Sequence, residues 1–156
     1  MTGEMMWQAY CNAAKIAPKT RHDLWKFCGG GVFADELVNL VLTGVKTASA
    51  STKPAYELEG EDLPETGTYS VILFDNEEAA CVIRDTKVSV VPFGQVNAEH
   101  AYKEGEDDRS LEKWREAHRR AFAPDYRAAG LPFDESGECV LEEFEVVYPK
   151  NESDIK

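Results

Sequence analysis

The sequence predicts an α+β fold with a mostly antiparallel sheet that can close into a small β-barrel. Runs rich in Val, Ile, Tyr and Phe fall in the middle and at the end of the chain, and amphipathic segments with helical spacing come before and between them. These segments lack the regular strand–helix rhythm of a parallel βαβ sheet. With 156 residues the chain has the size of one domain, and such a domain buries about two-thirds of its unfolded surface without needing a disulfide or a metal.

The first quarter of the chain is predicted to be helical. Apolar side chains recur at helical spacing over residues 4–16, and three glycines at 29–31 then indicate a turn. A second helix is predicted over residues 34–42, with an apolar face and acidic residues in its first turn. Gly44 follows this helix and suits the left-handed conformation in which many helices end.

Strands are predicted through the middle of the chain. In residues 47–51, small apolar residues alternate with hydroxyl residues, which is typical of a strand with one solvent-exposed face. Residues 69–74 and 79–84 are rich in β-forming side chains and are separated by an acidic turn. Residues 87–92 are predicted to form a further strand.

Helices are predicted again after these strands. Short helical spacing over residues 98–103 precedes an acidic loop and a longer amphipathic helix over residues 111–122. Ser110 is the expected N-cap of the longer helix, and its His118 is expected to be a packed, hydrogen-bonded core histidine. A last strand is predicted over residues 139–148. The basic side chains of the longer helix are expected to face solvent: Lys113, Arg115, Arg119 and Arg120.

Neither an internal repeat nor a long linker divides the chain. We interpret residues 1–29 as an N-terminal helical extension packed on the domain, and residues 30–148 as the domain itself. The polar tail at residues 149–156 is expected to be frayed.

Composition and charge exclude several classes of protein. The net charge of −12 argues against sequence-independent binding to a polyanion, because that binding depends on Lys and Arg neutralising phosphates, so no double-stranded DNA partner is expected. No apolar run approaches the ~20 residues that span a bilayer, and the N-terminus lacks the features of a signal peptide. A cytoplasmic protein without a membrane partner is therefore predicted. The cysteines are widely spaced, so free thiols and no zinc site are expected: Cys11, Cys28, Cys81 and Cys139.

Reactive side chains are concentrated in two segments. A hydroxyl becomes a nucleophile when a neighbouring base takes its proton, and a neutral lysine such as Lys46 can be that base. In a regular strand Lys46 and Ser49 point to opposite faces, so they converge only if the chain bends between Gly44 and Thr47. Taken alone, Lys46 is also compatible with an ordinary surface lysine. The second segment, residues 99–109, carries acids that could act in proton transfer or hold a divalent cation, although most such runs are solvated loops.

The order of the motifs is more informative than any one of them. The segment LTGVKTASAS at residues 42–51 ends a predicted helix, and LPETG at residues 63–67 precedes the central strands. The segment EGEDDRSL at residues 104–111 follows those strands and leads to Trp114 and His118. Together these motifs resemble the ASCH domain family in its longer bacterial form.

The resemblance, which covers about residues 30–148, implies a PUA-like fold with a cleft that holds Lys46. The PUA-like superfamily is associated with RNA binding, and ASCH proteins include amidohydrolases acting on N(4)-acetylcytidine nucleosides and ribonucleases. Matching by position implies catalytic roles for Lys46, Ser49 and Glu104. Ser49 stands where the amidohydrolase has threonine, and the arginine that often ends the lysine motif is absent. Further residues are expected to bind ligand, the aromatic ones by stacking: Gly44, Thr47, Ser51, Tyr56, Arg84, Phe93 and Arg109.

Three functions are compatible with this set, each with a nucleoside or short single-stranded RNA as partner. In an amidohydrolase, Lys46 would deprotonate Ser49, which attacks the amide carbonyl, while Glu104 passes a proton to the leaving amine. In a ribonuclease, Lys46 and Arg84 would contact phosphate. A divalent metal is expected only for the ribonuclease, and no other cofactor is expected. The third function is a non-catalytic module that binds RNA or a nucleoside.

Overall fold

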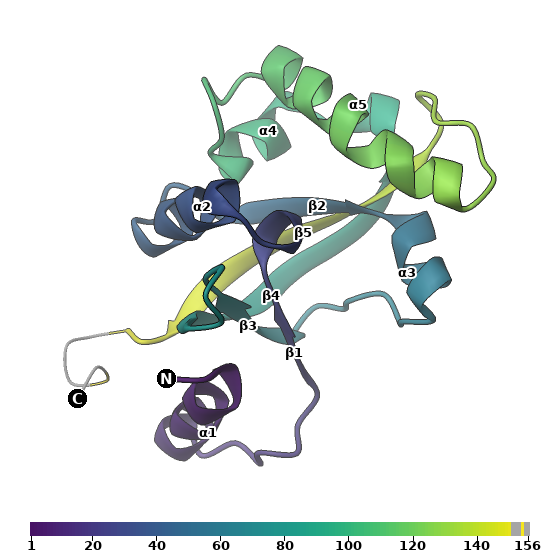
Figure 1. The fold of residues 1–156 in the computed structure, drawn as a ribbon. Coiled ribbons are helices and arrows are strands. Elements are labelled where there is room, and N and C mark those ends of the chain that lie inside the picture. Colours follow the sequence, from purple (N-terminus) through teal and green to yellow (C-terminus); the bar gives the residue numbers. More distant parts are fainter. Residues whose placement is uncertain (151–153, 155–156) are drawn as a thin grey trace. The chain divides into compact units, whose positions relative to one another are not determined.

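The computed structural model, which describes residues 1–150 and residue 154, contains strands that pair in the order β1-β3-β4-β5-β2 (Figure 1). β1 pairs in parallel with β3, whereas β3 pairs with β4 and β2 with β5 in antiparallel fashion. The α+β prediction and the mostly antiparallel sheet are therefore confirmed. The strands are β1 His22–Trp25, β2 Ala48–Thr52, β3 Tyr69–Leu73, β4 Ala79–Pro92 and β5 Glu138–Tyr148.

The predicted closure into a barrel is not found in the described part of the chain, because β1 and β2 each have a single neighbour and form the two edges of the sheet. These edge strands are only four and five residues long. Short edges expose little unpaired backbone, which is a common way to protect an open sheet from pairing with other chains.

Each segment predicted to be helical contains a helix, and the two predicted caps are found. The Ser110 side chain accepts a hydrogen bond from the backbone N–H of Lys113, as expected of an N-cap. Gly44 follows α2 with a φ of +80°, in the predicted left-handed conformation. The helices are α1 Gly3–Ala14, α2 Val32–Leu42, α3 Lys53–Glu59, α4 Ala98–Glu104 and α5 Leu111–Ala128. None of these is both long and apolar enough to cross a membrane.

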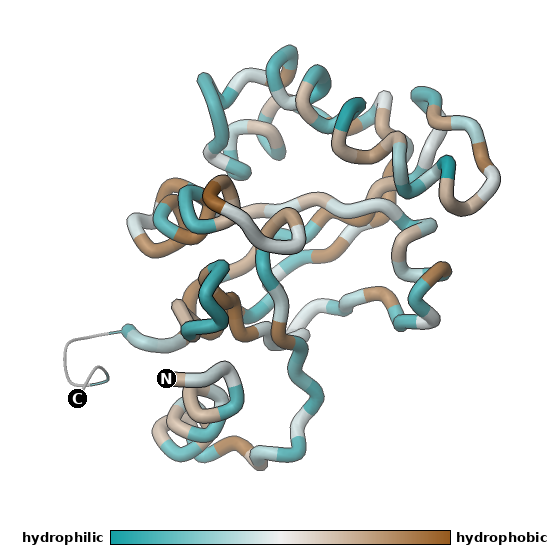
Figure 2. Tube along the Cα trace, in the orientation of Figure 1, coloured by the Kyte–Doolittle hydropathy of each residue, from teal (hydrophilic) through white to brown (hydrophobic). Residues whose placement is uncertain are grey.

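The chain divides into two units, of which unit 1 comprises Met1–Val45, Thr66–Thr86 and Phe144–Lys156. Its interior is apolar. The helix α2, in which several residues are brown in Figure 2, packs its buried side chains with residues of β3 and β4, and α1 packs through Trp7 in a second apolar cluster. The tail predicted to fray, residues 149–156, lies partly outside the described residues.

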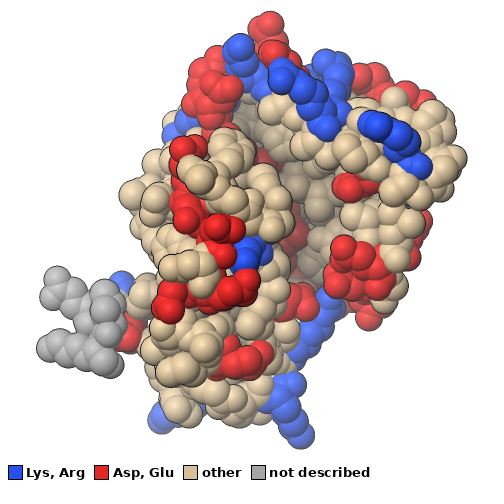
Figure 3. Space-filling view, in the orientation of Figure 1, with Lys and Arg blue, Asp and Glu red and all other residues tan. Residues whose placement is uncertain are grey.

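Unit 2 comprises Lys46–Glu65 and Lys87–Glu143. Its apolar cluster joins α4, α5, β5 and the segment after β4, with side chains that include Phe93, Trp114 and Phe122. Both α4 and α5 contact β2. Lys and Arg side chains gather along α5, as Figure 3 shows, yet Arg115 does not simply face solvent as predicted. Its guanidinium donates hydrogen bonds to the backbone carbonyls of residues 93, 94 and 96 at 2.9–3.2 Å.

Four local features differ from the sequence prediction. β1 and α3 were not predicted, the two strands expected at 79–84 and 87–92 form the single strand β4, and α5 continues to Ala128 through Pro124. β1 has only four residues and little apolar character. The helix α3 begins at Thr52, whose hydroxyl accepts from the backbone N–H of Ala55. All four cysteines are free thiols, as predicted.

Candidate functional site

Lys46 is buried in unit 2, although lysine usually keeps its ammonium in water. The residue is 2% exposed, and its Nζ lies 2.7 Å from Glu106 Oε2. The same nitrogen donates to the backbone carbonyl of Glu104 at 3.3 Å and lies 3.6 Å from the Glu104 carboxylate. Lys46 is therefore not an ordinary surface lysine: it is a buried cation compensated by two carboxylates.

The Glu104 carboxylate lies at the centre of this group. Its Oε2 accepts hydrogen bonds from His100 Nε2 at 2.7 Å and from the Trp114 indole at 2.6 Å. Its Oε1 lies 3.5 Å from His118 Nε2. An isolated carboxylate at this depth would cost several kcal/mol, and these donors together with Lys46 offset that cost. We call the whole group the lysine cluster: Lys46, His100, Glu104, Glu106, Trp114 and His118.

The protonation states of the lysine cluster follow from its geometry. His118 Nδ1 lies 2.7 Å from the carbonyl oxygen of Trp114, which can only accept, so Nδ1 carries a hydrogen. Burial lowers the pKa of His118, but the hydrogen bond and charge of Glu104 raise it by more, so the pKa lies above its ordinary value. Burial raises the pKa of Glu104, but hydrogen bonds from both histidines and the charge of Lys46 hold it well below the usual range. Glu104 is therefore a carboxylate at neutral pH, and the environment favours His118 as an imidazolium.

Helix α4 positions two members of the cluster. The Asn97 side chain caps the helix by accepting from the backbone N–H of His100 at 2.9 Å. His100 and Glu104 are four residues apart, so they share one face of the helix and hydrogen-bond directly. Gly105 then ends the helix in the left-handed conformation, with a φ of +72°.

A tight turn after α4 positions Glu106. Asp107 and Arg109 both have a positive φ, 54° and 65°, a conformation that aspartate tolerates better than most residues. The backbone N–H of Arg109 donates to the carbonyl of Glu106 at 2.9 Å. The Arg109 guanidinium lies over the ring of Tyr102, 3.6 Å from its centroid, and donates to the Tyr102 carbonyl. Arg109, expected to bind ligand, thus contributes to holding this turn.

Three members of the cluster have the spacing of metal ligands. Atoms of Glu104, Glu106 and His118 lie within 4.8 Å of one another. The Lys46 ammonium already compensates both carboxylates, however, and the raised pKa of His118 favours a proton over a metal at its Nε2. A divalent cation at these three residues would compete with the Lys46 ammonium for both carboxylates.

Ser49 lies on the face of β2 that points away from α5. Side chains alternate along a strand, and Ala50 packs in the apolar cluster with Trp114 while Thr52 Oγ1 donates to Asp125 of α5 at 2.9 Å. The side chain of Ser49 is therefore not brought to the lysine cluster. Such convergence would have required a bend of the chain between residues 44 and 47. Within the described residues the Ser49 hydroxyl makes no hydrogen bond to Lys46 or Glu104.

A second polar group occupies that other face of β2. Ser51 Oγ lies 3.1 Å from the hydroxyl of Tyr56, which in turn donates to Glu142 Oε1 at 3.5 Å. Glu142 is the register partner of Ser49 in the antiparallel pair of β2 and β5, so the two side chains share this face. We call Ser49, Ser51, Tyr56 and Glu142 the hydroxyl face.

The other residues expected to bind ligand do not form a single group within unit 2. Thr47 donates its backbone N–H to the carbonyl of Lys103 at 2.8 Å and so ties the start of β2 to α4. Phe93 has no exposed surface and packs against Trp114, so it is a core side chain and is not available for stacking. Gly44 and Arg84 belong to unit 1. The local sequence Pro92-Phe93 does not indicate whether the ring of Phe93 is buried or exposed.

Sequence reasoning missed two members of the lysine cluster and underrated a third. His100 and Trp114 were not predicted as partners of Glu104, and Glu106 was treated only as part of an acidic segment. The signal was present in the spacing: His100 precedes Glu104 by four residues, and Trp114 precedes His118 by four, so each pair shares one face of its helix.

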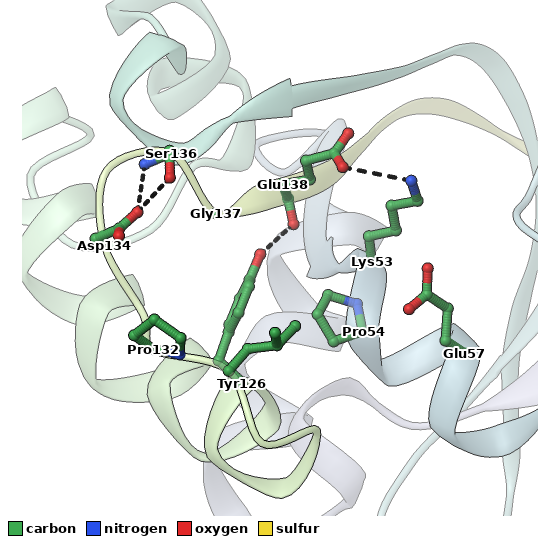
Figure 4. A pocket seen from close by; sticks show the side chains of 10 residues that line it. Lys53, Pro54, Glu57, Tyr126, Pro132, Asp134, Ser136, Gly137 and Glu138 are labelled. Carbon is green, nitrogen blue, oxygen red and sulfur yellow. Dashed lines mark hydrogen bonds and ion pairs between the residues drawn. The ribbon is translucent and has the colours of Figure 1, made fainter.

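Unit 2 also contains a cavity of about 300 Å³ between the start of α3, the end of α5 and the loop before β5 (Figure 4). The Lys53 ammonium and Glu138 form an ion pair of 3.3 Å at its rim, and the Tyr126 hydroxyl donates to the Glu138 carbonyl. None of the predicted site residues lines this cavity. Its lining consists of Lys53, Pro54, Glu57, Tyr126, Leu131, Pro132, Asp134, Ser136, Gly137 and Glu138.

Comparison with known proteins identifies the family. The family model for the ASCH domain matches residues 23–148. The ASCH domain from Lactobacillus crispatus JV V101 is 32% identical, with a TM-score of 0.83 and a match that covers 94% of each chain. Protein EF3133 from Enterococcus faecalis V583 is also 32% identical, with a TM-score of 0.82, over 92% of this chain and 86% of that one. Among curated proteins no match is found.

The chain belongs to the ASCH domain family, and its α+β architecture is of the PUA-like type. Membership of this family is consistent with RNA binding.

Proposed function

We propose that this ASCH domain binds a cytidine nucleoside, free or within a short single-stranded RNA, and hydrolyses an N(4)-acetyl amide on it. The observation that carries the proposal is the environment of Lys46. Its ammonium is buried, lies 2.7 Å from Glu106, and is held in place by Glu104. The Glu106 side chain is 23% exposed, so the cluster reaches the surface at this residue.

Amide hydrolysis needs the two kinds of group that this arrangement offers. A fixed positive donor stabilises the negative charge that develops on the carbonyl oxygen. A carboxylate can carry the proton from the attacking oxygen to the leaving amine. Because an ammonium donates hydrogens and has no lone pair, the part that suits Lys46 is polarisation of the acyl oxygen, not removal of a proton from Ser49.

The net charge supports a small ligand over a long RNA. Each phosphate that binds must be neutralised, and the chain carries 29 acidic against 17 basic residues. A nucleoside carries no phosphate, so its binding and turnover should depend only weakly on salt.

Lys46→Met tests the proposal. Purified protein is incubated with N(4)-acetylcytidine, and cytidine and acetate are measured by liquid chromatography. The wild type is expected to release both, and Lys46→Met is expected to lose turnover by about 10²–10³-fold, as for the loss of an oxyanion donor. Lys113→Met, which removes an exposed lysine of α5, is the matched control and should turn over like the wild type.

Folding of the Lys46 variant needs its own check, because Glu104 and Glu106 lose their cation. Near-ultraviolet circular dichroism reports the packing of the aromatic side chains, Trp114 among them, and Lys46→Arg keeps the charge while changing the donor geometry. Wild-type turnover in a folded Lys46→Met protein would contradict the proposal.

A ribonuclease is the second candidate, and the spacing of Glu104, Glu106 and His118 is the observation that favours it. The same preparation is given a short single-stranded RNA with and without EDTA. RNA cleavage that EDTA abolishes and that falls steeply with salt would favour the ribonuclease. Binding of either ligand without turnover would favour a non-catalytic module.

A further inference from the structure

The two acidic residues that hold Lys46, Glu104 and Glu106, differ in their exposure and in the number of hydrogen bonds that their carboxylates accept. Both oxygens of Glu104 are engaged: Oε2 accepts from His100 and Trp114, and Oε1 faces His118 and Lys46. The residue is 1% exposed. Because two hydrogen bonds occupy one oxygen and two cationic side chains flank the other, Glu104 is less available to a water molecule or a substrate than a carboxylate with an open oxygen.

The Glu106 carboxylate, in contrast, is partly exposed and, among the described residues, accepts a hydrogen bond at only one of its oxygens. Only its Oε2 is engaged, by the Lys46 ammonium at 2.7 Å, and within the described residues its other oxygen makes no hydrogen bond. Its side chain is 23% exposed, so a water molecule can reach it. The N–H of Gly105 donates to the Tyr102 carbonyl before Glu106, and the N–H of Arg109 donates to the Glu106 carbonyl after it, so the carboxylate is held close to the ammonium without being enclosed.

We propose that Glu106 is the general base of this site and that Glu104 is a positioning residue that acts through Lys46. The proposal rests on the proposed function, since it assigns a role in the hydrolysis of the N(4)-acetyl amide. It replaces a serine nucleophile by a water molecule.

The proposed reaction balances as follows. Glu106 takes a proton from water while the water oxygen forms a bond to the acetyl carbon, and the carbonyl electron pair moves to the oxygen, which accepts a hydrogen bond from Lys46. The oxyanion then re-forms its double bond, and the carbon–nitrogen bond breaks. The proton held by Glu106 passes to the leaving nitrogen. The products are the free exocyclic amine of cytidine and acetic acid, which ionises to acetate.

Glu106→Gln is the first test, and Asp107→Asn is its matched control. Both variants remove one negative charge at adjacent positions of the same turn, but only Glu106 contacts Lys46. Glu106→Gln is expected to lower kcat by about 10²–10⁴-fold, the usual contribution of a general base. The value of KM should change little, and Asp107→Asn should keep the wild-type kcat. Equal kcat values in the two variants would overturn the inference.

Chemical rescue separates catalysis from a merely structural role. Glu106→Ala leaves space at a solvent-accessible position, and added formate can supply a carboxylate there. We expect formate to restore part of the lost turnover in Glu106→Ala and to leave Asp107→Asn unchanged. If formate has no effect on a folded Glu106→Ala protein, Glu106 is not the base.

Failure of this inference is distinguishable from failure of the proposed function. If the wild type does not release acetate from N(4)-acetylcytidine, the proposed function is wrong and the role of Glu106 in it is wrong too. If the wild type turns over and an acetyl adduct accumulates on Ser49, detected by mass spectrometry, the function holds but the water mechanism is overturned. Turnover without an adduct, together with formate rescue, supports both.

Discussion

The lysine cluster and the hydroxyl face start within three residues of each other on the chain, yet they differ in almost every physical respect. The cluster buries a cation and a carboxylate, and Glu104 alone receives donors from three other side chains besides Lys46. The hydroxyl face consists of half-buried and buried side chains joined by single contacts of 3.1 and 3.5 Å between Ser51, Tyr56 and Glu142. One region is a buried network of charged groups, and the other is a group of hydroxyls beside one carboxylate.

The difference shows how a short motif can supply two unlike environments. Alternation along β2 sends Ser49 and Ser51 away from α5, whereas Lys46 precedes the strand and reaches α4 and the turn after it. Low local dielectric makes a satisfied buried network stabilising as a whole and makes each of its members costly to remove. Substitutions in the cluster should therefore have large effects, and substitutions on the hydroxyl face should have small ones.

The largest effect is expected for Glu104→Gln. The change leaves the buried Lys46 ammonium with Glu106 as its remaining carboxylate, and breaking a buried ion pair from one side costs about 3–5 kcal/mol of the free energy of unfolding. Urea denaturation followed by tryptophan fluorescence measures this loss. Glu99→Gln is the control on the same helix, because the Glu99 side chain is 73% exposed and should contribute little. A midpoint for Glu104→Gln as close to the wild type as that of Glu99→Gln would contradict the view that the buried contacts of the cluster stabilise the fold.

A change in pH is expected to have a smaller effect on the free energy of unfolding. The pKa of Glu104 is lowered in the folded protein, so its stabilisation is complete above its ordinary value of 4.5 and is lost as pH falls toward the folded pKa. The pKa of His118 is raised, so its stabilisation is complete below its ordinary value of 6.5 and is lost as pH rises through the folded pKa. The contribution of the pair is therefore greatest between these two ordinary values.

His118→Gln isolates that contribution. The free energy of unfolding of the wild type should fall as the pH rises above 6.5 and through the raised pKa of His118, and the variant should lose less because it lacks the group that deprotonates. Titrating groups outside the lysine cluster affect both proteins equally, so the difference between the two slopes reports on the cluster. Identical slopes would show that His118 does not stabilise the cluster by its charge.

Local rules of chain geometry account for most of the fold that could be predicted. The cap at Ser110 and the left-handed Gly44 depend on neighbouring residues only, and both are confirmed. The break predicted between two strands at residues 85–86 failed because backbone pairing continues there. The N–H of Asp85 donates to the Thr68 carbonyl at 2.9 Å, and its carbonyl accepts from Gly67 at 2.8 Å. Tertiary hydrogen bonds thus outweigh the low strand propensity of an aspartate.

The candidate site was predictable only in part, for a related reason. Lys46 and Glu104 were paired through the order of family motifs, and they are in contact. The partners His100 and Trp114 belong to helices whose mutual packing no local pattern determines, because the contact that joins them runs through the buried Glu104 carboxylate. The same limit explains Phe93, whose burial depends in part on Trp114 and Phe122 of α5, which lie far along the chain.

The smallest effect is expected for Ser49→Ala, and it is the sharpest test of the contrast between the two regions. The Ser49 hydroxyl has no hydrogen-bond partner among the described side chains, so its removal should change the free energy of unfolding by no more than about 0.5 kcal/mol. If water is the nucleophile, kcat for N(4)-acetylcytidine should also stay within about twofold of the wild type, whereas loss of a serine nucleophile costs several orders of magnitude. Ser51→Ala serves as the control, because it removes a hydroxyl from the same face that does contact Tyr56. A loss of turnover confined to Ser49→Ala would mean that this hydroxyl reaches the reacting carbon in the substrate complex. The separation of the hydroxyl face from the lysine cluster would then describe only the free protein.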